Sequence, residues 1–199
     1  HYGAWQVQTS DGDFSCAMVV NAAGAWATTI AGLAKAQTIE ITPKRRSAVL
    51  LDLPESANVD QWPLCFGAGE TFYFKPMGGK LMLSPADATP VDPHDAWADD
   101  MALAEAVEKF QNVIDFEVHH IGHTWGGLRS FADDGNPVVG FDEQTDNFFW
   151  LAGQGGYGIQ TAPALSRLSA ALIGGKQIPD DISAQGLELT SISPARFSS

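Results

Sequence analysis

Basic residues and cysteines are both scarce in this sequence, and each shortage narrows what the protein can do. Only 11 lysines and arginines stand against 24 aspartates and glutamates, which leaves a formal net charge of −13. A surface this acidic repels the phosphates of nucleic acids and the headgroups of anionic membranes, so neither is an expected partner. Any arginine held in a pocket of such a protein therefore stands out as a candidate ligand contact.

The two cysteines, Cys16 and Cys65, lie far apart in apolar surroundings. This usage predicts no disulfide framework and favours a reducing compartment, so we expect a cytoplasmic location, with peripheral attachment to the inner face of the membrane left open. Long apolar runs are lacking too: none approaches the roughly eighteen residues of a membrane span, and no secretion signal is visible at the start.

The remaining composition is that of an ordinary globular protein, with 45% hydrophobic and 18% charged residues. A chain of 199 residues can bury a substantial core and would normally form one domain or slightly more. The coarse order is strand and helix, then several strands with one long helix, then strand and helix again. This order predicts an α+β fold that retains an α/β part.

The most informative stretch is a strand, a glycine turn and a helix. The apolar run 148–152 precedes four glycines, which permit positive φ and close approach of a ligand to main-chain N–H groups: Gly153, Gly155, Gly156 and Gly158. A helical pattern follows to residue 173, with Pro163 expected in its first turn. Such a helix N-terminus favours an anion or an electron-rich oxygen, but a tight turn that binds nothing fits the pattern equally well.

The first forty residues predict a hairpin and then a buried strand that leads into a helix. The hairpin is expected over 5–20, the apolar strand over 16–26 and the helix over 26–35. Ala22 and Gly24 follow that strand, where ligands meet α/β sheets, so they would let a cofactor come close. Close packing of the helix on the sheet is the alternative explanation for these small residues.

Adjacent cations lie in an extended segment over 39–53: Lys44, Arg45 and Arg46. Such a group is usually a solvated bend. An alternating strand, however, would send Arg45 and Arg46 to opposite faces. An arginine that points inward requires a partner, and the carboxylate of a ligand is a natural one.

Further strands are expected over 62–66, 71–75 and 80–84, followed by an amphipathic helix over 97–112. Tyr73 faces away from its two phenylalanine neighbours. A tyrosine in that position is more often packing than a ligand contact. The acidic face of the helix is most simply solvated surface.

Residues 116–130 predict a strand that ends in glycines and an arginine. His119 and His123 share a face of it, but a third ligand at a convincing spacing is lacking, so no metal site is predicted. Arg129 follows glycines that allow close approach beside its charge. A strand over 137–141 then leads to the glycine turn, and the polar end of the chain is expected to be peripheral or frayed.

Four segments, taken in order and spacing, resemble the D-amino-acid oxidase superfamily of FAD-dependent amine oxidoreductases. They are VVNAAGAW at 19–26, YFKP at 73–76, WGGLR at 125–129 followed by DGNPVVG at 134–140, and LAGQGGYG at 151–158. Within this superfamily, residues 43–46, 70–73 and 153–163 are most similar to the bacterial D-arginine dehydrogenases. Any one motif is moderately specific, and four in order are strongly so.

The resemblance spans nearly the whole of this chain but only the C-terminal half of the proteins in the family. The GxGxxG motif that holds the FAD pyrophosphate has no counterpart here. The resemblance therefore implies a C-terminal fragment whose partners are the N-terminal half of the same polypeptide, a small amino-acid substrate and an unidentified electron acceptor. It divides the chain into the end of the FAD-binding domain, the substrate-binding domain, a return to the FAD-binding domain and a C-terminal tail: 1–38, 39–130, 131–175 and 176–199.

The resemblance also implies roles for individual residues. Arg129, Tyr73 and Arg46 match groups that bind the substrate carboxylate, while the Gly127 carbonyl matches an acceptor for the substrate amine. Leu64 and Phe66 match positions that line the pocket for the substrate side chain. Gln160 matches a glutamine that lies near both flavin and substrate. The flavin contacts implied are Ala22, Gly24, Gly153, Gly155, Gly156, Tyr157, Gly158, Ile159 and Gln160. The acidic residue that would select a cationic substrate has no counterpart in this chain.

The function that follows is oxidation of the Cα–N bond of a D-amino acid, or a related amine acid, to an imino acid. FAD does the chemistry by accepting hydride at N5, so no catalytic side chain is predicted. We expect the chain by itself to be inactive. The alternative is a binding or assembly module that acts without catalysis.

Overall fold

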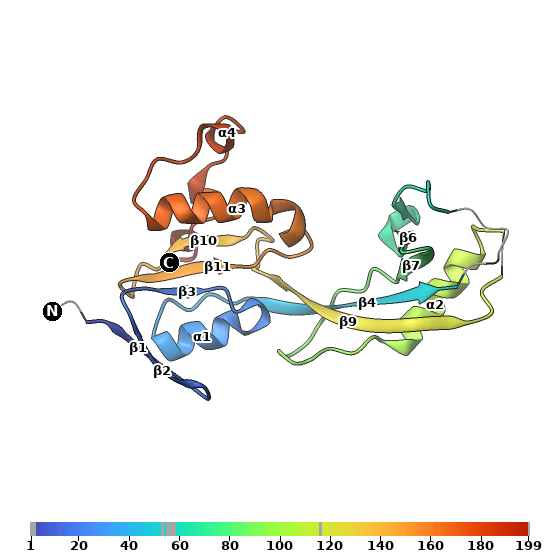
Figure 1. Ribbon diagram of the computed structural model, residues 1–199, viewed down its shortest axis with the longest axis horizontal. Helices are drawn as coiled ribbons and strands as arrows, with labels where there is room; N and C mark the ends of the chain where they lie inside the picture. The colour runs from blue at the N-terminus through green and yellow to red at the C-terminus, as the bar shows by residue number, and fades with distance from the viewer. Residues whose placement is uncertain (1–2, 53, 55–58, 116, 199) are drawn as a thin grey trace. The chain divides into compact units, whose positions relative to one another are not determined.

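The computed structural model describes residues 3–52, 54, 59–115 and 117–198 (Figure 1). They form two compact units: unit 1 contains the described residues up to Thr42 and from Arg129 onward, and unit 2 runs from Pro43 to Leu128. Helices and both antiparallel and parallel strand pairs occur, which confirms the predicted α+β fold class. None of the described helices is long and apolar enough to cross a membrane.

Unit 1 is built on a sheet of three strands in the order β10 (Val138–Phe141), β11 (Phe148–Ala152) and β3 (Val19–Asn21). Strand β11 pairs parallel with β3 and antiparallel with β10. It is apolar on both faces because both are covered. Phe148 and Trp150 pack in one cluster with α1 (Ala27–Ala34), whereas Phe149 packs in another with α3 (Gly158–Ile173), and the two helices lie on opposite sides of the sheet (Figure 1).

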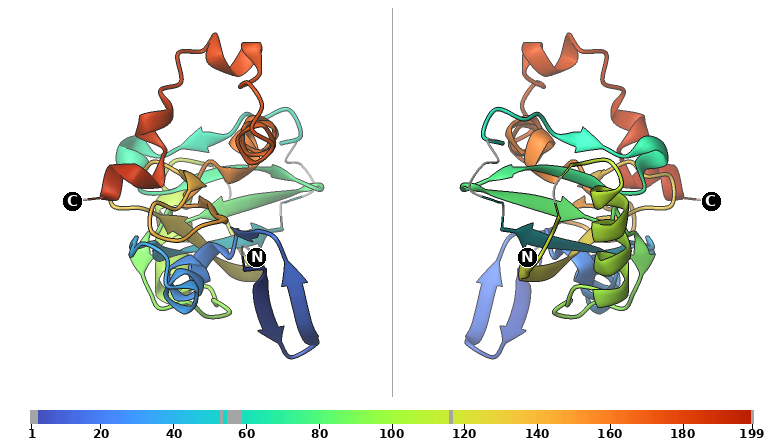
Figure 2. Two further views of the ribbon diagram at one scale, coloured as in Figure 1. Left: turned by 90° about the vertical axis from the view of Figure 1, so that its left-hand side faces the viewer. Right: turned by 90° about the vertical axis from the view of Figure 1, so that its right-hand side faces the viewer.

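The run 16–26, expected as one continuous strand, is instead divided between two sheets. The hairpin joins β1 (Trp5–Thr9) to β2 (Gly12–Cys16), which therefore ends at Cys16, and it stands apart from α1 (Figure 2). The chain then enters β3, and a single 3-10 turn, η1 (Gly24–Trp26), leads into α1. The prediction was wrong because hydrophobicity does not show where a chain changes its pairing partner.

Up to residue 198 the end of the chain packs against the sheet, so of the two expectations, peripheral or frayed, the frayed one was wrong. It contains α4 (Asp180–Ser183), η3 (Leu189–Ser191) and η4 (Pro194–Phe197). Ile182 and Ile192 are buried against Phe149, and the N–H of Val139 donates to the carbonyl of Ile192 at 2.8 Å. These two isoleucines, which lie in a mostly polar stretch, help to hold the segment against the sheet.

Unit 2 contains a sheet in the order β5, β6, β7, β4 and β8, and β4 also pairs with β9. The strands are β4 (Thr42–Leu51), β5 (Cys65–Phe66), β6 (Tyr73–Met77), β7 (Lys80–Ser84), β8 (Thr89–Pro90) and β9 (Ile121–Phe131), with η2 (Ala68–Glu70) between β5 and β6. The core joins alternate residues of β4 and β7, and Phe74 of β6, to α2 (Asp100–Gln111), with Phe74 meeting Phe110 edge to face.

Element ends differ from prediction where capping or pairing overrides the hydrophobic pattern. Helix α2 starts at Asp100 rather than 97, because the carboxylate of Asp99 accepts a hydrogen bond from the N–H of Ala102 at 3.0 Å and caps the helix. Helix α3 begins at Gly158, which puts Pro163 in its second turn instead of its first. Of the strand expected over 116–130, residue 116 lies outside the described residues, 117–120 are not strand, and β9 covers the rest and continues to Phe131.

Candidate functional site

In unit 2, the structure brings together three residues that the sequence singled out. The guanidinium carbon of Arg46, on β4, lies 5.8 Å from the centroid of the Tyr73 ring, on β6. Tyr73 is paired with Phe66 of β5, and their ring centroids are 5.6 Å apart. A cation therefore sits beside an aromatic wall, an arrangement suited to an anionic group carried on an apolar body.

The neighbouring arginines Arg45 and Arg46 have different surroundings, as strand alternation predicts. Arg45 donates through Nη2 to Asp99 at 2.5 Å, and its Nε lies 3.6 Å from a carboxylate oxygen of Asp87. The Nε of Arg46 is buried and has no hydrogen-bond partner within the described part of the chain. The Nε of Arg45 likewise lacks a hydrogen-bond partner within the described residues. The guanidinium of Arg45 is nevertheless paired with Asp99 and Asp87, whereas Arg46 retains hydrogen-bonding capacity for a ligand.

The carboxylates around Arg45 form a fixed structural network. Asp87 accepts hydrogen bonds from the N–H and the hydroxyl of Ser47, at 2.7 and 2.9 Å, and that hydroxyl in turn accepts from the N–H of Asp99 at 3.0 Å. The hydrogen bond from Ala102, helped by the charge of Arg45, lowers the pKa of Asp99. An ionised Asp99 keeps Arg45 neutralised, so this arginine is unsuited to binding a substrate anion.

Elsewhere in unit 2, predicted ligand contacts are open to solvent. Leu64 and Phe66 are 48% and 59% exposed. Gly127, on β9, is exposed, and no atom lies within 4 Å of where its Cβ would be. Apolar side chains left half exposed in this way are more consistent with a binding surface than with a core.

In unit 1, the glycine turn is held against the end of β9. The N–H of Gly155 donates to the carbonyl of Ser130 at 2.8 Å. Gly155 has φ +55°, and a Cβ there would lie 2.7 Å from the ring of Phe131. A Cβ on Gly156 would lie 3.2 Å from Nη1 of Arg129. Arg129 therefore lies directly against the turn.

The start of α3 has the features of a site for an electron-rich group. Tyr157 occupies the N-cap position, and no side chain caps the helix. The first N–H groups of a helix have no partner within it, and they carry the positive end of its dipole. Tyr157 and Ile159 are 67% and 94% exposed, and Gln160 is exposed too. The turn also needs its glycine at Gly153, where φ is +72°.

The remaining predicted cofactor contacts lie after β3. Ala22 is exposed, and Gly24 adopts φ +57°, which favours glycine. The amide of Asn21 donates to the carbonyl of Ala27 at 2.9 Å and so anchors the start of α1. The backbone therefore remains accessible next to the sheet, as close approach of a cofactor would require.

Sequence reasoning missed Ser130 and Phe131, which brace the glycine turn, and Gln154, whose side chain donates to the carbonyl of Leu151 at 3.2 Å. Gln154 and Gly158 line a hollow of about 330 Å³ together with residues of β11 and α3. One feature of the sequence could have pointed to Ser130 and Phe131: the strand continues beyond Arg129. Residues on that continuation had to pack beside another element, which is the glycine turn.

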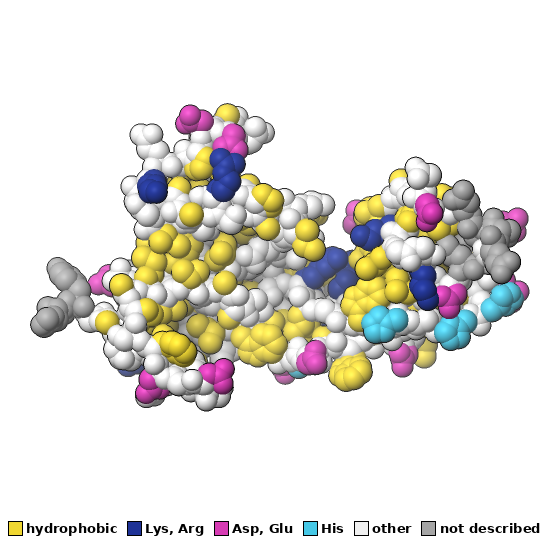
Figure 3. All heavy atoms as spheres, viewed as in Figure 1, with side chains coloured by type: hydrophobic (Ala, Val, Ile, Leu, Met, Phe, Trp, Pro, Cys, Tyr) yellow, Lys and Arg dark blue, Asp and Glu magenta, His cyan; other side chains and the backbone are white. Residues whose placement is uncertain are grey.

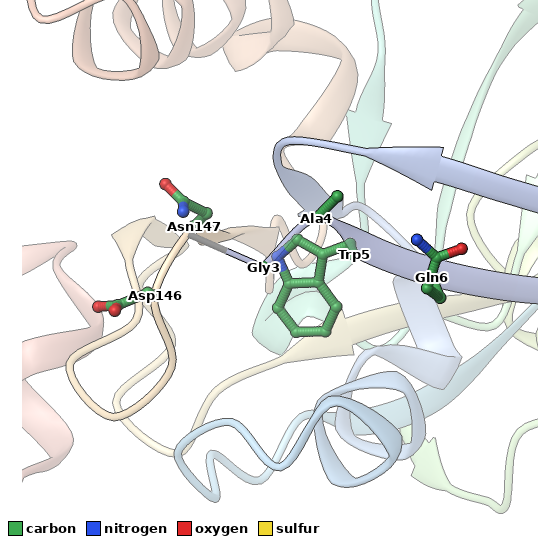
Figure 4. Close-up of a pocket in the computed structure, with 6 residues that line it drawn as sticks. All are labelled: Gly3, Ala4, Trp5, Gln6, Asp146 and Asn147. Carbon is green, nitrogen blue, oxygen red and sulfur yellow. The ribbon is translucent and has the colours of Figure 1, made fainter. Parts of the chain in front are cut away.

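Other features do not add to the site. A hollow of about 300 Å³ beside the hairpin contains none of the predicted residues and is lined by Gly3, Ala4, Trp5, Gln6, Asp146 and Asn147 (Figure 4). Among the described residues, no three histidines, cysteines or carboxylates group as metal ligands would. His123 stacks on Trp125 instead, with ring centroids 5.8 Å apart. Acidic side chains are scattered on the face shown in Figure 3 rather than gathered into one patch.

The uncapped helix start and the glycine turn are suited to an electron-rich ligand, and comparison with known proteins gives the family. Residues 1–172 match the family described as DAO, FAD dependent oxidoreductase, so the chain belongs to it and its cofactor is FAD. The uncapped start of α3 and the glycine turn fit a flavin. A relative, FAD-dependent oxidoreductase domain-containing protein 1 of Xenopus laevis, is 30% identical over 173 residues, which are 79% of this chain and 35% of that protein.

Solved structures share the fold. Glycine oxidase from Geobacillus kaustophilus aligns with a TM-score of 0.80 at 20% identity, covering 100% of this chain and 52% of that one. Iminodiacetate oxidase from Chelativorans sp. BNC1 aligns with a TM-score of 0.74 at 19% identity, covering 96% and 52%. The chain thus spans about half the length of these solved relatives and about a third of the curated one.

Proposed function

We propose that the whole protein oxidises the Cα–N bond of a D-amino acid, or a related amine acid, to the imino acid. Bound FAD supplies the chemistry by accepting hydride at N5. Family membership supports the reaction type, and glycine oxidase and iminodiacetate oxidase share the fold. The observation that carries the proposal is the buried Nε of Arg46, without a hydrogen-bond partner in the described chain and beside Tyr73.

The residues of this chain bind and orient the substrate. Arg46 and Arg129 hold the α-carboxylate through charge-assisted hydrogen bonds, and the Tyr73 hydroxyl donates to the same group. The carbonyl of Gly127 accepts from the substrate amine. Fixing both ends of the reacting centre in this way lowers the barrier by positioning, an effect that reaches about 7 kcal/mol or more in well-oriented systems.

The residues after β3 and the glycine turn hold the cofactor. Gly153 to Gln160 would offer main-chain N–H groups and the start of α3 to the flavin, and Ala22 and Gly24 would let the cofactor approach closely. The positive end of the α3 dipole would favour an electron-rich group of the bound cofactor. Gln160 lies at the border between cofactor and substrate.

The substrate class is the finer part of the proposal. Leu64 and Phe66 present half-exposed apolar surface, which suits either an apolar side chain or the methylene stem of a long cationic one. The similarity to D-arginine dehydrogenases favours the second. We propose that the rest of the polypeptide supplies the pyrophosphate site and the selecting carboxylate, that a separate acceptor reoxidises the flavin, and that the protein works in the cytoplasm.

The test is steady-state oxidation of paired D- and L-amino acids, arginine and leucine among them, by the full-length flavoprotein. We expect turnover of D-isomers and a KM raised about 100-fold by Arg129→Ala, because a bidentate ion pair is lost. A full-length protein that retains FAD but oxidises no amino acid would overturn the proposal, and preferential turnover of L-isomers would overturn its stereochemistry.

A companion test addresses the 199-residue chain by itself. We expect it to retain no flavin after purification with added FAD, because in our proposal the rest of the polypeptide supplies the site for the pyrophosphate. Stoichiometric retention would contradict this, and turnover by the isolated chain would show that it is an enzyme by itself. A folded chain that binds neither flavin nor substrate is the expected result.

A further inference from the structure

The backbone conformation at position 156 does not require glycine. The φ of Gly156 lies outside the left-handed region, unlike that of Gly155, and the residue is exposed. What a Cβ at position 156 would meet is the guanidinium of Arg129, at 3.2 Å from Nη1 and 3.8 Å from Cζ. The close neighbour is therefore a functional side chain rather than the core.

We propose that Gly156 is a positioning residue for Arg129. By lacking a side chain, it leaves the space in which the guanidinium lies against the glycine turn. The inference rests on the proposed function, in which Arg129 binds the substrate carboxylate and the turn contacts the flavin. It adds that the glycine turn sets the position of the Arg129 guanidinium and therefore of the substrate carboxylate. Because the same turn contacts the flavin, the contact between Gly156 and Arg129 sets the distance between substrate and cofactor.

The backbones on both sides of this contact are fixed to each other. Gly155 donates to Ser130 at 2.8 Å, and the ring of Phe131 packs against Gly155. These ties join the residues next to Gly156 and Arg129, so the two main chains are held together beside the pair. A methyl group at position 156 must then displace the guanidinium, by a few tenths of an ångström, since long side chains yield more easily than braced backbone.

The first test is Gly156→Ala in the full-length flavoprotein. We expect KM for the amino acid to rise about fivefold with kcat nearly unchanged, because a misplacement of about 1 Å can cost about 100-fold and this one is smaller. Flavin content should stay stoichiometric. Gly32→Ala is the matched control: Gly32 is exposed on α1, has no left-handed φ, and no atom lies within 4 Å of its would-be Cβ. It should leave KM unchanged.

A double-mutant cycle separates positioning from a general effect on the turn. In an Arg129→Lys background the side chain has no Nη1 to displace, so Gly156→Ala should change KM less than about twofold. An equal change in both backgrounds, or no change in either, would overturn the inference. If the wild-type protein oxidises no amino acid, it is the proposed function that fails. The inference about Gly156 is then tested by a crystal structure of the Gly156→Ala variant. An Arg129 guanidinium that keeps its original position in that structure overturns the inference.

Discussion

The carboxylate of Asp142 accepts a hydrogen bond from the indole Nε1 of the fully buried Trp150 at 2.9 Å. The same carboxylate accepts from the N–H of Gln37 at 3.0 and 3.2 Å, and from Gln144 and Thr145 at 3.0 and 2.8 Å. The Asp142 side chain therefore ties the loop between β10 and β11 to the sheet core and to the segment after α1. In every one of these contacts an N–H group donates to the carboxylate.

Removing this carboxylate should destabilise unit 1 strongly. We expect Asp142→Ala to lower the free energy of unfolding by about 3 kcal/mol, because it strands buried N–H donors, including that of Trp150. Urea denaturation followed by tryptophan fluorescence measures it. Asp146→Ala, an exposed aspartate in the same loop, is the control and should change stability by less than about 0.5 kcal/mol. Equal effects would refute the assigned role.

The adjacent arginines should separate stability from substrate binding. Arg46→Ala should raise KM by about 100-fold with little loss of stability, since its Nε gives up no hydrogen bond within the described chain. Arg45→Ala should leave KM within about threefold but lower stability by about 1 kcal/mol, because Asp99 loses its ion pair. Kinetics and thermal unfolding of both variants provide the measurement, and the reverse pattern would exchange the two roles.

The glycine turn should respond to substitution through a clash as well as through strain. Gly155→Ala combines φ +55° with a Cβ 2.7 Å from the Phe131 ring, so we expect a loss of about 3 kcal/mol in unfolding free energy. Gly175→Ala, at φ +59° with open space, should lose only the strain of about 1 kcal/mol. Adding Phe131→Ala to Gly155→Ala should cost less than the sum of the single changes; simple additivity would exclude the clash.

The acid sensitivity of the end of the chain should depend on Asp134. Arg196 donates to it through Nε at 2.6 Å and Nη2 at 3.0 Å, and this hydrogen bonding lowers its pKa from the ordinary value of 3.8. A lowered folded-state pKa means that the unfolded chain takes up the proton first. The stabilisation is therefore fully present above the unfolded-state pKa and is lost as pH falls through the folded-state pKa.

Comparing the wild type with Asp134→Asn across pH measures this contribution. At pH 7 the variant should be the less stable of the two. The difference between their unfolding free energies should begin to narrow below about pH 4 and vanish below the folded-state pKa of Asp134. Asp133→Asn provides a neighbouring exposed aspartate as control. A gap that stays constant down to pH 2 would show that Asp134 contributes through something other than its charge.

Local patterns in the sequence predicted the parts of the site that depend on neighbours along the chain. The strand, glycine turn and helix over 148–173 follow from hydrophobicity and glycine spacing, and the different surroundings of Arg45 and Arg46 follow from the alternation of a strand. Local patterns failed at the N-terminus of α3, where Pro163 suggested a later start, and at the end of β2, where one apolar run serves two sheets.

By itself, the sequence indicated the class of protein only through four ordered motifs that resemble a flavin-linked family, since composition is ordinary and the glycine spacing left a turn that binds nothing equally open. Only the tertiary structure decided which arginine is neutralised, because Asp87 and Asp99 reach Arg45 from distant parts of the chain. It also decided that the polar end is packed, through Ile182 and Ile192, and that Arg129 lies against Gly156. Such contacts join residues far apart in sequence, and local periodicity carries no information about which distant groups meet.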